Sequence, residues 1–240
     1  MTDAPTDRAR VCSLLDLTML RAIDQRQDIV RLCQHAAAPG AGLPPVAAVC
    51  VHADRADVAV SMLAGTSVRV AAVAGAFPDA RSPLAVRVAE IEHVVALGVD
   101  EVDVPIDRAR VLASQWGELA QELATIRKAS GDATLKLILE GSEIADPAML
   151  RAAGLASLEA GADFLKTSTG RAGPATPQMV GVLLGVVLEH GRGGVKVAGG
   201  VRTFEQARDF LIQADVALGP VTPDGFRIGA STLLDDLATT

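Results

Sequence analysis

Lysine side chains occur within short apolar runs that are typical of buried strands. Lys166 lies in FLKTSTG, Lys196 in VKVAGG and Lys136 in LKLILE, and Asp103 lies in a similar run, EVDVP. An unpaired charge is costly to bury, so we expect these side chains to cluster and to compensate one another. A cluster of amines around a carboxylate is suited to proton transfer and to nucleophilic catalysis.

Lys166 and Lys196 are 30 residues apart, about the length of one strand and one helix with their loops. This spacing predicts similar heights on neighbouring strands, about 4.8 Å apart. Like charges this close disfavour double protonation, and partial burial acts in the same direction. One amine would then be neutral near pH 7 and able to attack a carbonyl and form an imine. Asp103 would balance the remaining charge and assist proton transfer.

A purely structural ion network is the alternative to catalysis. Each of the two lysines Lys166 and Lys196 is followed by a small polar or Gly-rich loop, which favours catalysis. Lys136 has no such loop behind it. We therefore interpret Lys136 as a structural or electrostatic partner of Asp103 or Glu140.

Glycine-containing segments follow three consecutive strand candidates: Gly170-Arg171, Gly199-Gly200 and Gly229-Ala230-Ser231. Glycines let backbone N–H groups approach an anion closely, while Ser231 adds a hydroxyl and Arg171 adds a cation. The loops after the last strands of α/β barrels often bind phosphate. Beside paired lysines, these segments predict a small phosphorylated carbonyl compound as the substrate.

Short runs rich in Val, Ile and Leu alternate with longer Ala-rich segments along the chain. This alternation predicts parallel strands with helices outside, and eight units in 240 residues predict an α/β protein with a single (β/α)8 TIM barrel, one domain over residues 1–240. A doubly wound sheet is the alternative, but DLTMLR follows the first strand where G-x-G-x-x-G would be expected. The predicted strands are 13–16, 46–51, 68–73, 101–104, 135–140, 164–167, 194–198 and 226–228. The predicted helices are 24–37, 54–64, 83–97, 108–129, 147–160, 177–190, 203–213 and 232–238.

Six segments resemble the 2-deoxyribose-5-phosphate aldolase family, in order, from about residue 12 to 234. They are DLT (16–18), VCV (49–51), EVD (101–103), LKTSTG (165–170), KVAGGVR (196–202) and GAS (229–231). KTSTG and KVAGGVR are specific for this family when they occur together.

The resemblance implies a class I, Schiff-base aldolase without cofactor or metal. Its members reversibly cleave 2-deoxy-D-ribose 5-phosphate to D-glyceraldehyde 3-phosphate and acetaldehyde. It implies that Lys166 forms the Schiff base, that Lys196 lowers the pKa of Lys166 and transfers protons, and that Asp103 relays protons through water. The residues expected to bind the sugar phosphate are Gly170, Arg171, Gly199, Gly200, Gly229 and Ser231. The residues expected to support the site are Asp16, Cys50, Lys136 and Glu140.

The sequence departs from the family pattern in four places. The segment 71–80, AAVAGAFPDA, carries an extra Ala76, and PIDRAR follows Asp103 in place of an apolar or amide-rich stretch. Arg171 stands where Lys or Gly is frequent, a change that still favours phosphate. The sequence has no Tyr, so the proton transfer that a C-terminal tyrosine assists in some members is absent or is taken over by water. Because segment 71–80 would line the barrel mouth, two alternatives stay open: a Schiff-base aldolase for a different phosphosugar or aldehyde, and a non-catalytic sugar-phosphate binding barrel.

Composition restricts the partners and the compartment. With 2% aromatic residues and a net charge of −7, we expect no nucleic-acid binding. The longest apolar run, residues 179–188, is half the length of a membrane span, and the first residues lack the apolar stretch of a secretory signal. Three cysteines without C-x-x-C spacing and four scattered histidines favour neither a disulfide framework nor a metal site. We therefore expect a metal-independent cytoplasmic enzyme that binds no membrane and forms a homo-oligomer, a dimer.

Overall fold

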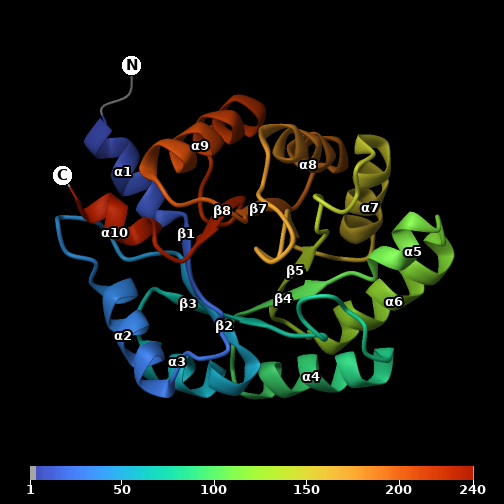
Figure 1. Ribbon diagram of the computed structural model, residues 1–240, viewed down its shortest axis with the longest axis horizontal. Coiled ribbons are helices and arrows are strands. Elements are labelled where there is room, and N and C mark those ends of the chain that lie inside the picture. Colours follow the sequence, from blue (N-terminus) through green and yellow to red (C-terminus); the bar gives the residue numbers. More distant parts are fainter. Residues whose placement is uncertain (1–3, 240) are drawn as a thin grey trace.

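Eight parallel strands close into a barrel in the computed structural model, which describes residues 4–239. Each strand pairs with the next one along the chain, and pairing of the first with the last closes the ring. Figure 1 shows the strands at the centre of a ring of helices. The predicted (β/α)8 TIM barrel is confirmed. The strands are β1 (Leu15–Met19), β2 (Ala48–His52), β3 (Arg69–Val73), β4 (Glu101–Pro105), β5 (Thr134–Ile138), β6 (Phe164–Lys166), β7 (Gly194–Ala198) and β8 (Phe226–Ala230).

At least one helix follows each strand and packs on the outside of the barrel (Figure 1). This order is the reason for the parallel sheet, because each helix returns the chain to the side from which the next strand starts. The helical elements are α1 (Ala4–Ser13), α2 (Arg26–Ala37), the short 3-10 helix η1 (Ala53–Arg55), α3 (Ala56–Leu63), α4 (Leu84–Ala96), α5 (Arg108–Leu112), α6 (Trp116–Ala129), α7 (Pro147–Glu159), α8 (Pro177–His190), α9 (Phe204–Leu218) and α10 (Leu233–Ala238).

Two helical segments differ from the sequence-based expectation. The predicted helix 108–129 is two helices, because Ser114 adopts a left-handed backbone with φ of 54° and ends α5 before α6 begins. The sequence pattern does not predict α1, which precedes the barrel and occupies Ser13, so β1 begins later than expected. Neither difference moves a strand out of the barrel.

Capping side chains fix the helices that follow the loops after β6 and β7. The Thr176 hydroxyl accepts a hydrogen bond from the Met179 N–H at the start of α8, at 3.2 Å. At the start of α9, Thr203 and Gln206 form the capping box that T-x-x-Q predicts. These caps set where each loop ends at the rim of the barrel.

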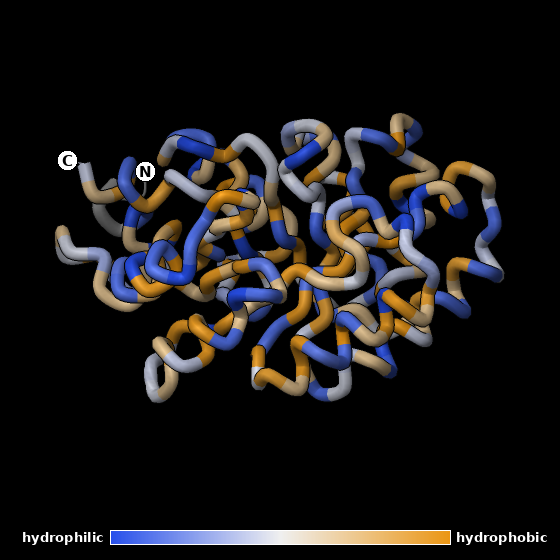
Figure 2. Tube along the Cα trace, turned by 60° about the horizontal axis from the view of Figure 1, so that its bottom comes forward, coloured by the Kyte–Doolittle hydropathy of each residue, from blue (hydrophilic) through white to orange (hydrophobic). Residues whose placement is uncertain are grey.

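The two faces of the strands differ in polarity. Outward side chains such as Val102, Leu137 and Leu165 belong to the hydrophobic core beneath the helices, and the strand segments in the middle of Figure 2 are largely orange. Register places Asp103 beside Lys136 and Lys166 beside Lys196. An outward lysine would be buried against apolar helices, whereas inward lysines can pair with acids. The charged side chains of these strands, Asp103, Lys136, Lys166 and Lys196, therefore all point into the barrel.

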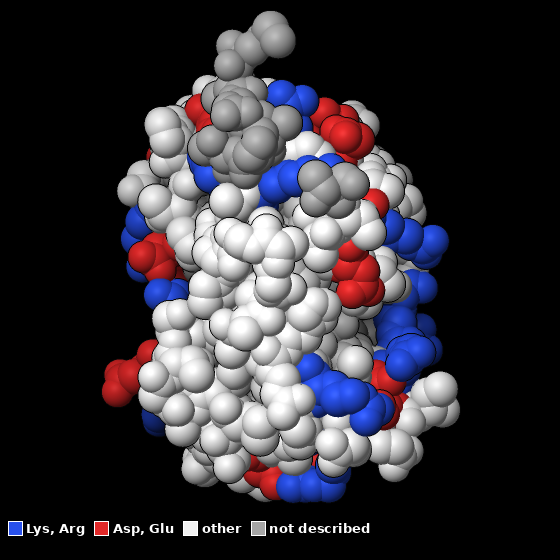
Figure 3. Space-filling view, turned by 90° about the vertical axis from the view of Figure 1, so that its left-hand side faces the viewer, with Lys and Arg blue, Asp and Glu red and all other residues white. Residues whose placement is uncertain are grey.

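The face that carries α1, α10 and the loop between α2 and β2 has few charged side chains at its centre (Figure 3). Residues 36–51, which include that loop, contain no Asp, Glu, Lys or Arg. Among residues 4–239, no helix is both long enough and apolar enough to span a bilayer. The centre of this face is therefore largely uncharged, whereas charged side chains surround it (Figure 3).

Candidate active site

Two lysine amines share one carboxylate oxygen at the centre of the barrel. Lys166 Nζ lies 2.6 Å from Asp103 Oδ2, and Lys196 Nζ lies 2.7 Å from the same atom. Lys166 and Lys196 are register partners on β6 and β7, as their spacing predicts, and all three side chains are buried. The amines are close because the negative charge of Asp103 offsets their mutual repulsion.

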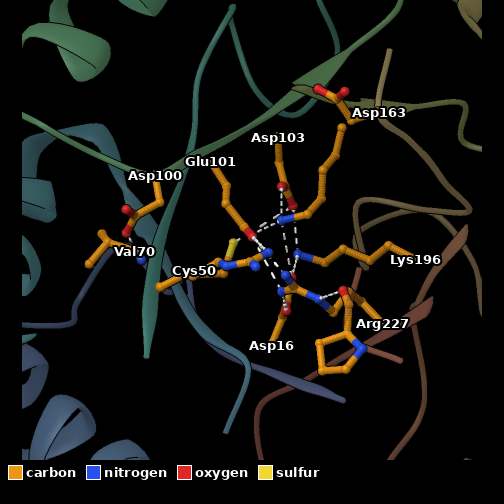
Figure 4. A network of polar contacts seen from close by, with 12 residues as sticks. Asp16, Cys50, Val70, Asp100, Glu101, Asp103, Asp163, Lys196 and Arg227 are labelled. Atoms are coloured by element: carbon orange, nitrogen blue, oxygen red, sulfur yellow. Dashed lines mark hydrogen bonds and ion pairs between the residues drawn. The ribbon is translucent and has the colours of Figure 1, made fainter. Parts of the chain in front are cut away.

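A second group of charges lies directly against this trio, as Figure 4 shows. Lys196 Nζ lies 2.5 Å from Asp16 Oδ2, and Lys136 contacts Glu101 closely while approaching Asp16 and Asp103 to 3.4 Å. Lys136 thus pairs with Asp103, one of its two predicted partners. Asp16, expected as a supporting residue, joins the two groups.

Two members of this network, Glu101 and Arg227, are missing from the sequence-based prediction. Arg227 Nη1 lies 2.6 Å from Asp16 Oδ1, and Arg227 Nη2 lies 2.8 Å from Glu101 Oε1. Both side chains are fully buried. The signal was present in the sequence, because Glu101 lies two residues before Asp103 on the same face of the strand, and Arg227 lies within the apolar run FRIGA.

The buried carboxylates stay ionised because cations surround them. Burial alone would raise the pKa of Asp103, but Lys166, Lys196 and Lys136 outweigh burial and hold this pKa well below its ordinary value. Burial opposes ionisation of Asp16 too, yet Lys136, Lys196 and Arg227 lower its pKa. Both groups are therefore carboxylates at neutral pH and can accept protons.

Two of the interior lysines stay protonated for the converse reason. Burial alone would lower the pKa of Lys196, but Asp103 and Asp16 outweigh it and raise this pKa well above the ordinary value. For Lys136, burial is likewise outweighed by Asp16, Glu101 and Asp103, and the pKa is raised. Both amines are therefore ammonium ions at neutral pH.

Cys50 faces the same interior from β2. Its Sγ lies 3.8 Å from Asp103 Oδ2, and burial raises the pKa of the thiol. Cys50 is therefore a neutral thiol beside the Asp103 carboxylate at neutral pH. With Ala71 and Val73 it forms a small apolar cluster inside the barrel, against which Leu20 and Phe77 pack.

Of the two partners expected for Lys136, the structure shows Asp103 and not Glu140. Beyond the end of β5 its backbone is left-handed, with φ of 52°, and this turns the carboxylate away from the alternation of the strand. Glu140 Oε2 accepts hydrogen bonds from the Thr169 N–H, at 3.0 Å, and from the Thr169 hydroxyl. Glu140 thus orders the loop after β6, directly beyond Lys166.

A pocket of about 580 Å³ opens above the lysines at the C-terminal ends of β1, β6, β7 and β8. Lys166 and Lys196 lie at its floor. The structure brings together at its wall all the residues expected to bind phosphate: Gly170, Arg171, Gly199, Gly200, Gly229 and Ser231. Lining residues that the prediction did not include are Thr18, Leu20, Arg21, Thr169, Arg202 and Thr232.

The loop after β7 requires glycine and is joined to the loop after β6. Gly199 has φ of 101°, and a Cβ there would lie 2.9 Å from the Gly173 carbonyl oxygen. The Ala175 N–H donates to the Gly199 carbonyl at 2.9 Å, so the loops after β6 and β7 are joined. From the loop after β6, Arg171 donates through Nη2 to the Leu20 carbonyl across the pocket.

The altered segment 71–80 lies on the side of β2 and β3. Phe77 meets the His52 ring edge to face, with centroids 5.9 Å apart. The Ala76 N–H donates to Glu90 Oε2 at 2.7 Å, which fixes the extra residue against α4. None of residues 71–80 lines the pocket above Lys166 and Lys196, so the expectation that this segment lines the mouth stays a prediction.

Comparisons with known proteins show which family the chain belongs to. Residues 10–238 match the model of the DeoC/LacD family of aldolases. A mouse deoxyribose-phosphate aldolase is 37% identical over 250 residues, which cover 95% of this chain and 78% of the mouse protein. A crystal structure from Coccidioides immitis, assigned as a deoxyribose-phosphate aldolase, superposes with a TM-score of 0.83 at 29% identity, covering 95% of this chain and 85% of the other. A tetrameric deoxyribose phosphate aldolase from Aeropyrum pernix superposes with a TM-score of 0.77 at 25% identity, covering 99% of this chain and 97% of the other. The chain belongs to the DeoC/LacD family of aldolases.

Proposed function

We propose that the chain is a class I aldolase that reversibly cleaves 2-deoxy-D-ribose 5-phosphate to D-glyceraldehyde 3-phosphate and acetaldehyde through a Schiff base on Lys166. Family membership supports the aldolase reaction, and the name of the mouse relative supports the substrate. The observation that carries the mechanism is the pair of amines on Asp103 Oδ2 at the floor of the pocket.

The ion pairs favour Lys166 as the nucleophile. Lys136 and Lys196 are held as ammonium ions by two or more carboxylates each, whereas Lys166 pairs with Asp103 alone. Once neutral, its amine attacks the aldehyde carbon of the open-chain sugar, and loss of water gives the imine. The protonated imine then accepts the electron pair of the bond that breaks.

Asp103 and Lys196 move the protons. As a carboxylate, Asp103 accepts the proton of the C3 hydroxyl through water, the C2–C3 bond breaks, and the aldehyde phosphate leaves. The enamine that remains on Lys166 takes a proton at C2, and hydrolysis releases acetaldehyde and restores the amine. Lys196, an ammonium ion beside the same oxygen, supplies and regains protons during these steps.

The phosphate binds at the glycine loops. Backbone N–H groups of Gly199, Gly200 and Gly229 approach it, and Ser231 and Arg171 add a hydroxyl and a cation. Arg21 and Arg202 increase the positive charge of the wall, and no Asp or Glu lines the pocket within residues 4–239. A dianionic substrate is therefore favoured there.

Borohydride trapping tests the proposal directly. Acetaldehyde plus borohydride should place one ethyl group on Lys166, which peptide mass spectrometry locates, and the purified chain should cleave deoxyribose 5-phosphate with a chelator present. An adduct elsewhere, or none, contradicts the mechanism; trapping without cleavage of this sugar contradicts the substrate. The dimer and the cytoplasmic location stay predictions, and light scattering checks the dimer.

A further inference from the structure

Three cations occupy neighbouring strands at one height inside the barrel. Lys166 on β6 pairs in register with Lys196 on β7, which pairs in register with Arg227 on β8. With strands about 4.8 Å apart, the Cα atoms of Lys166 and Arg227 are separated by roughly 10 Å. Nothing in the proposed reaction uses Arg227 directly, yet it is fully buried in the same network.

Arg227 forms ion pairs with two carboxylates, Asp16 and Glu101, that also contact lysines of the network. Its Nη1 binds Asp16 Oδ1 at 2.6 Å and its Nη2 binds Glu101 Oε1 at 2.8 Å. Its Nε donates to the Pro223 carbonyl, which anchors the guanidinium at the base of the barrel. An arginine does not lose its proton in a protein, so this positive charge is permanent.

The permanent charge of Arg227 affects the net charge of the buried network. The buried part of the ion-paired network contains the carboxylates of Asp16, Glu101 and Asp103, and the cations of Lys136, Lys166, Lys196 and Arg227. The partly exposed Arg69 also contacts Glu101, but it is paired with Asp224, and this pair adds no net charge. With every group ionised, this buried network carries one excess positive charge. Excess charge is costly to bury, and the network can relieve it by releasing one lysine proton.

The contacts indicate which lysine releases it. Lys136 contacts three carboxylates, Asp16, Glu101 and Asp103. Lys196 contacts Asp16 and Asp103, but Lys166 contacts Asp103 alone. Lys166 therefore loses the least favourable interaction energy when it becomes neutral.

We propose that Arg227 is a positioning residue whose permanent charge makes Lys166 the neutral amine of the resting enzyme. The inference rests on the proposed Schiff-base function and names what prepares the nucleophile. Without Arg227, three carboxylates face three lysines and the network is balanced with Lys166 protonated. With Arg227 present, the charges of Asp16 and Glu101 are partly neutralised. The lysine that contacts the fewest carboxylates, Lys166, is then the cation in excess.

Other charged or titratable groups also face Lys166. Asp103 reaches it from β4, Lys196 from β7, Cys50 from β2 and Lys136 from β5. At the pocket, Glu140 is bound by Thr169 rather than by a cation of the network, and three arginines, Arg21, Arg171 and Arg202, line the mouth. At the opposite end, Arg69 contacts Glu101 at 3.4 Å but is 41% exposed and is also paired with Asp224. Apart from Arg69, which is replaced only in a control, none of these groups changes in the variants below, so differences between their pH profiles report the altered charge.

The test compares two substitutions of opposite sign. Arg227→Met removes a cation, so the acid limb of the pH profile of kcat/KM should move up by about one pH unit, the effect of a unit charge roughly 10 Å away at an effective dielectric constant near 20. Glu101→Gln removes an anion, so the same limb should move down by a similar amount. Borohydride trapping at Lys166, followed across pH by mass spectrometry, should shift in parallel with each profile.

Controls separate charge from structural damage. Arg227→Lys places an amine between the Asp16 and Glu101 carboxylates, which should hold it protonated as two carboxylates hold Lys196, so it should keep the wild-type midpoint. The double variant Arg227→Met/Glu101→Gln should return towards that midpoint. Arg69→Met, a matched removal of a solvent-screened cation from the same carboxylate, should move the midpoint little. Midpoints that stay fixed, or that move the same way in both single variants, overturn the proposal.

The remaining outcomes are also decisive. Should Arg227→Met not fold by circular dichroism, Glu101→Gln carries the test, and a midpoint that does not fall overturns the proposal. One outcome is that the wild-type enzyme traps acetaldehyde at Lys166 but the pH profiles of the variants do not move. This outcome refutes the role of Arg227 and leaves the proposed function standing. A wild-type chain that neither traps acetaldehyde nor cleaves the sugar refutes the function itself.

Discussion

At the scale of single residues, one oxygen atom organises the site. Asp103 Oδ2 accepts from the amines of Lys166 and Lys196, and each of these contacts has a different consequence. Lys196 is also held by Asp16 and stays charged, while among residues 4–239 Lys166 has no second carboxylate within ion-pair distance. The same atom therefore serves a permanent proton donor and an amine that can be released for attack.

Replacing Lys166 by Ala should abolish turnover and leave the barrel folded. Without the amine no imine forms, so we expect a loss on the order of 10³-fold or more in kcat for deoxyribose 5-phosphate, measured by release of acetaldehyde. Lys128→Ala on the exposed side of α6 is the matched control and should be fully active. Substantial activity of the Lys166 variant would refute covalent catalysis through this residue.

Replacing Lys196 by Leu should lower kcat and move the activity to higher pH. The Lys196 pKa is raised, so this residue contributes a full positive charge across the neutral range. Its removal takes away the cation nearest to Lys166 and exposes the amine to an unshared Asp103, which favours the protonated form. The pH profile of kcat/KM should shift by one pH unit or more, on the scale of about one unit for a neighbouring charge. A lower kcat with an unmoved profile would show that the two amines are not coupled.

At the scale of elements, the barrel rim separates two tasks. The loops after β6, β7 and β8 carry the glycines and Ser231, while the loop after β3 carries Phe77 to the opposite side. The bond from the Ala175 N–H to the Gly199 carbonyl makes the loops after β6 and β7 one unit. Backbone N–H groups of the glycine loops therefore lie on one side of the rim, and the apolar Phe77 lies on the other.

Replacing Gly200 by Val should weaken binding of the phosphate more than it affects chemistry. Gly200 has φ of 78°, and a Cβ there would lie 3.1 Å from Pro174 Cβ, so the loop must move away from the anion. We expect KM for deoxyribose 5-phosphate to rise about tenfold, with a much smaller change for free deoxyribose. Gly219→Val is the control, because φ there is 81° but no atom lies within 4 Å of the added Cβ and the residue ends α9 away from the pocket. Equal changes for both sugars would argue against a phosphate site at this loop.

The sequence predicted the elements better than the pairs of side chains between them. Alternating apolar runs determine the barrel and its register, because each strand has one face that must meet helices. The 30-residue spacing predicted that Lys166 and Lys196 are neighbours, but no spacing reveals which carboxylate each amine reaches. Glu140 shows the limit, since one left-handed residue after β5 turns it from Lys136 to Thr169. Arg227 shows a second limit. Its place in the network depends on ion pairs with Asp16 and Glu101 across the barrel, and the sequence of the last strand does not reveal these pairs.

At the scale of the whole molecule, lysine is confined almost entirely to the barrel. The sequence contains the lysines Lys128, Lys136, Lys166 and Lys196, and the last three are buried inside. Surface ion pairs use arginine instead, as in the contacts of Arg26 with Asp57 and of Arg151 with Glu189. A lysine can change its charge when buried, whereas an arginine cannot. Every lysine except Lys128 therefore lies inside the barrel, where the proposed chemistry takes place.

The interior network should also set the pH range in which the protein is stable. Asp16 and Asp103 have lowered pKa values in the folded chain, so below about pH 4 the unfolded chain takes up their protons first. Their stabilisation is present above that pH and is lost as pH falls, with a slope of about 2.7 kcal/mol per pH unit for two protons. Lys136 and Lys196 have raised pKa values, so their contribution is present below about pH 10.4 and is lost as pH rises further.

Urea unfolding followed by circular dichroism should therefore give a nearly constant free energy of unfolding from about pH 5 to 8. It should fall on the acid side through Asp16 and Asp103, and on the alkaline side first through the buried thiols of Cys12, Cys33 and Cys50, whose pKa values burial raises. Repeating the series in 1 M NaCl separates this network from the surface pairs, since salt screens exposed charges strongly and buried ones weakly. The acid slope should persist in salt, because Asp16 and Asp103 are inaccessible to solvent. A slope that disappears in salt, or that corresponds to fewer than one proton, would mean that the carboxylates inside the barrel are not the ionised groups on which the arrangement of Lys166 and Lys196 depends.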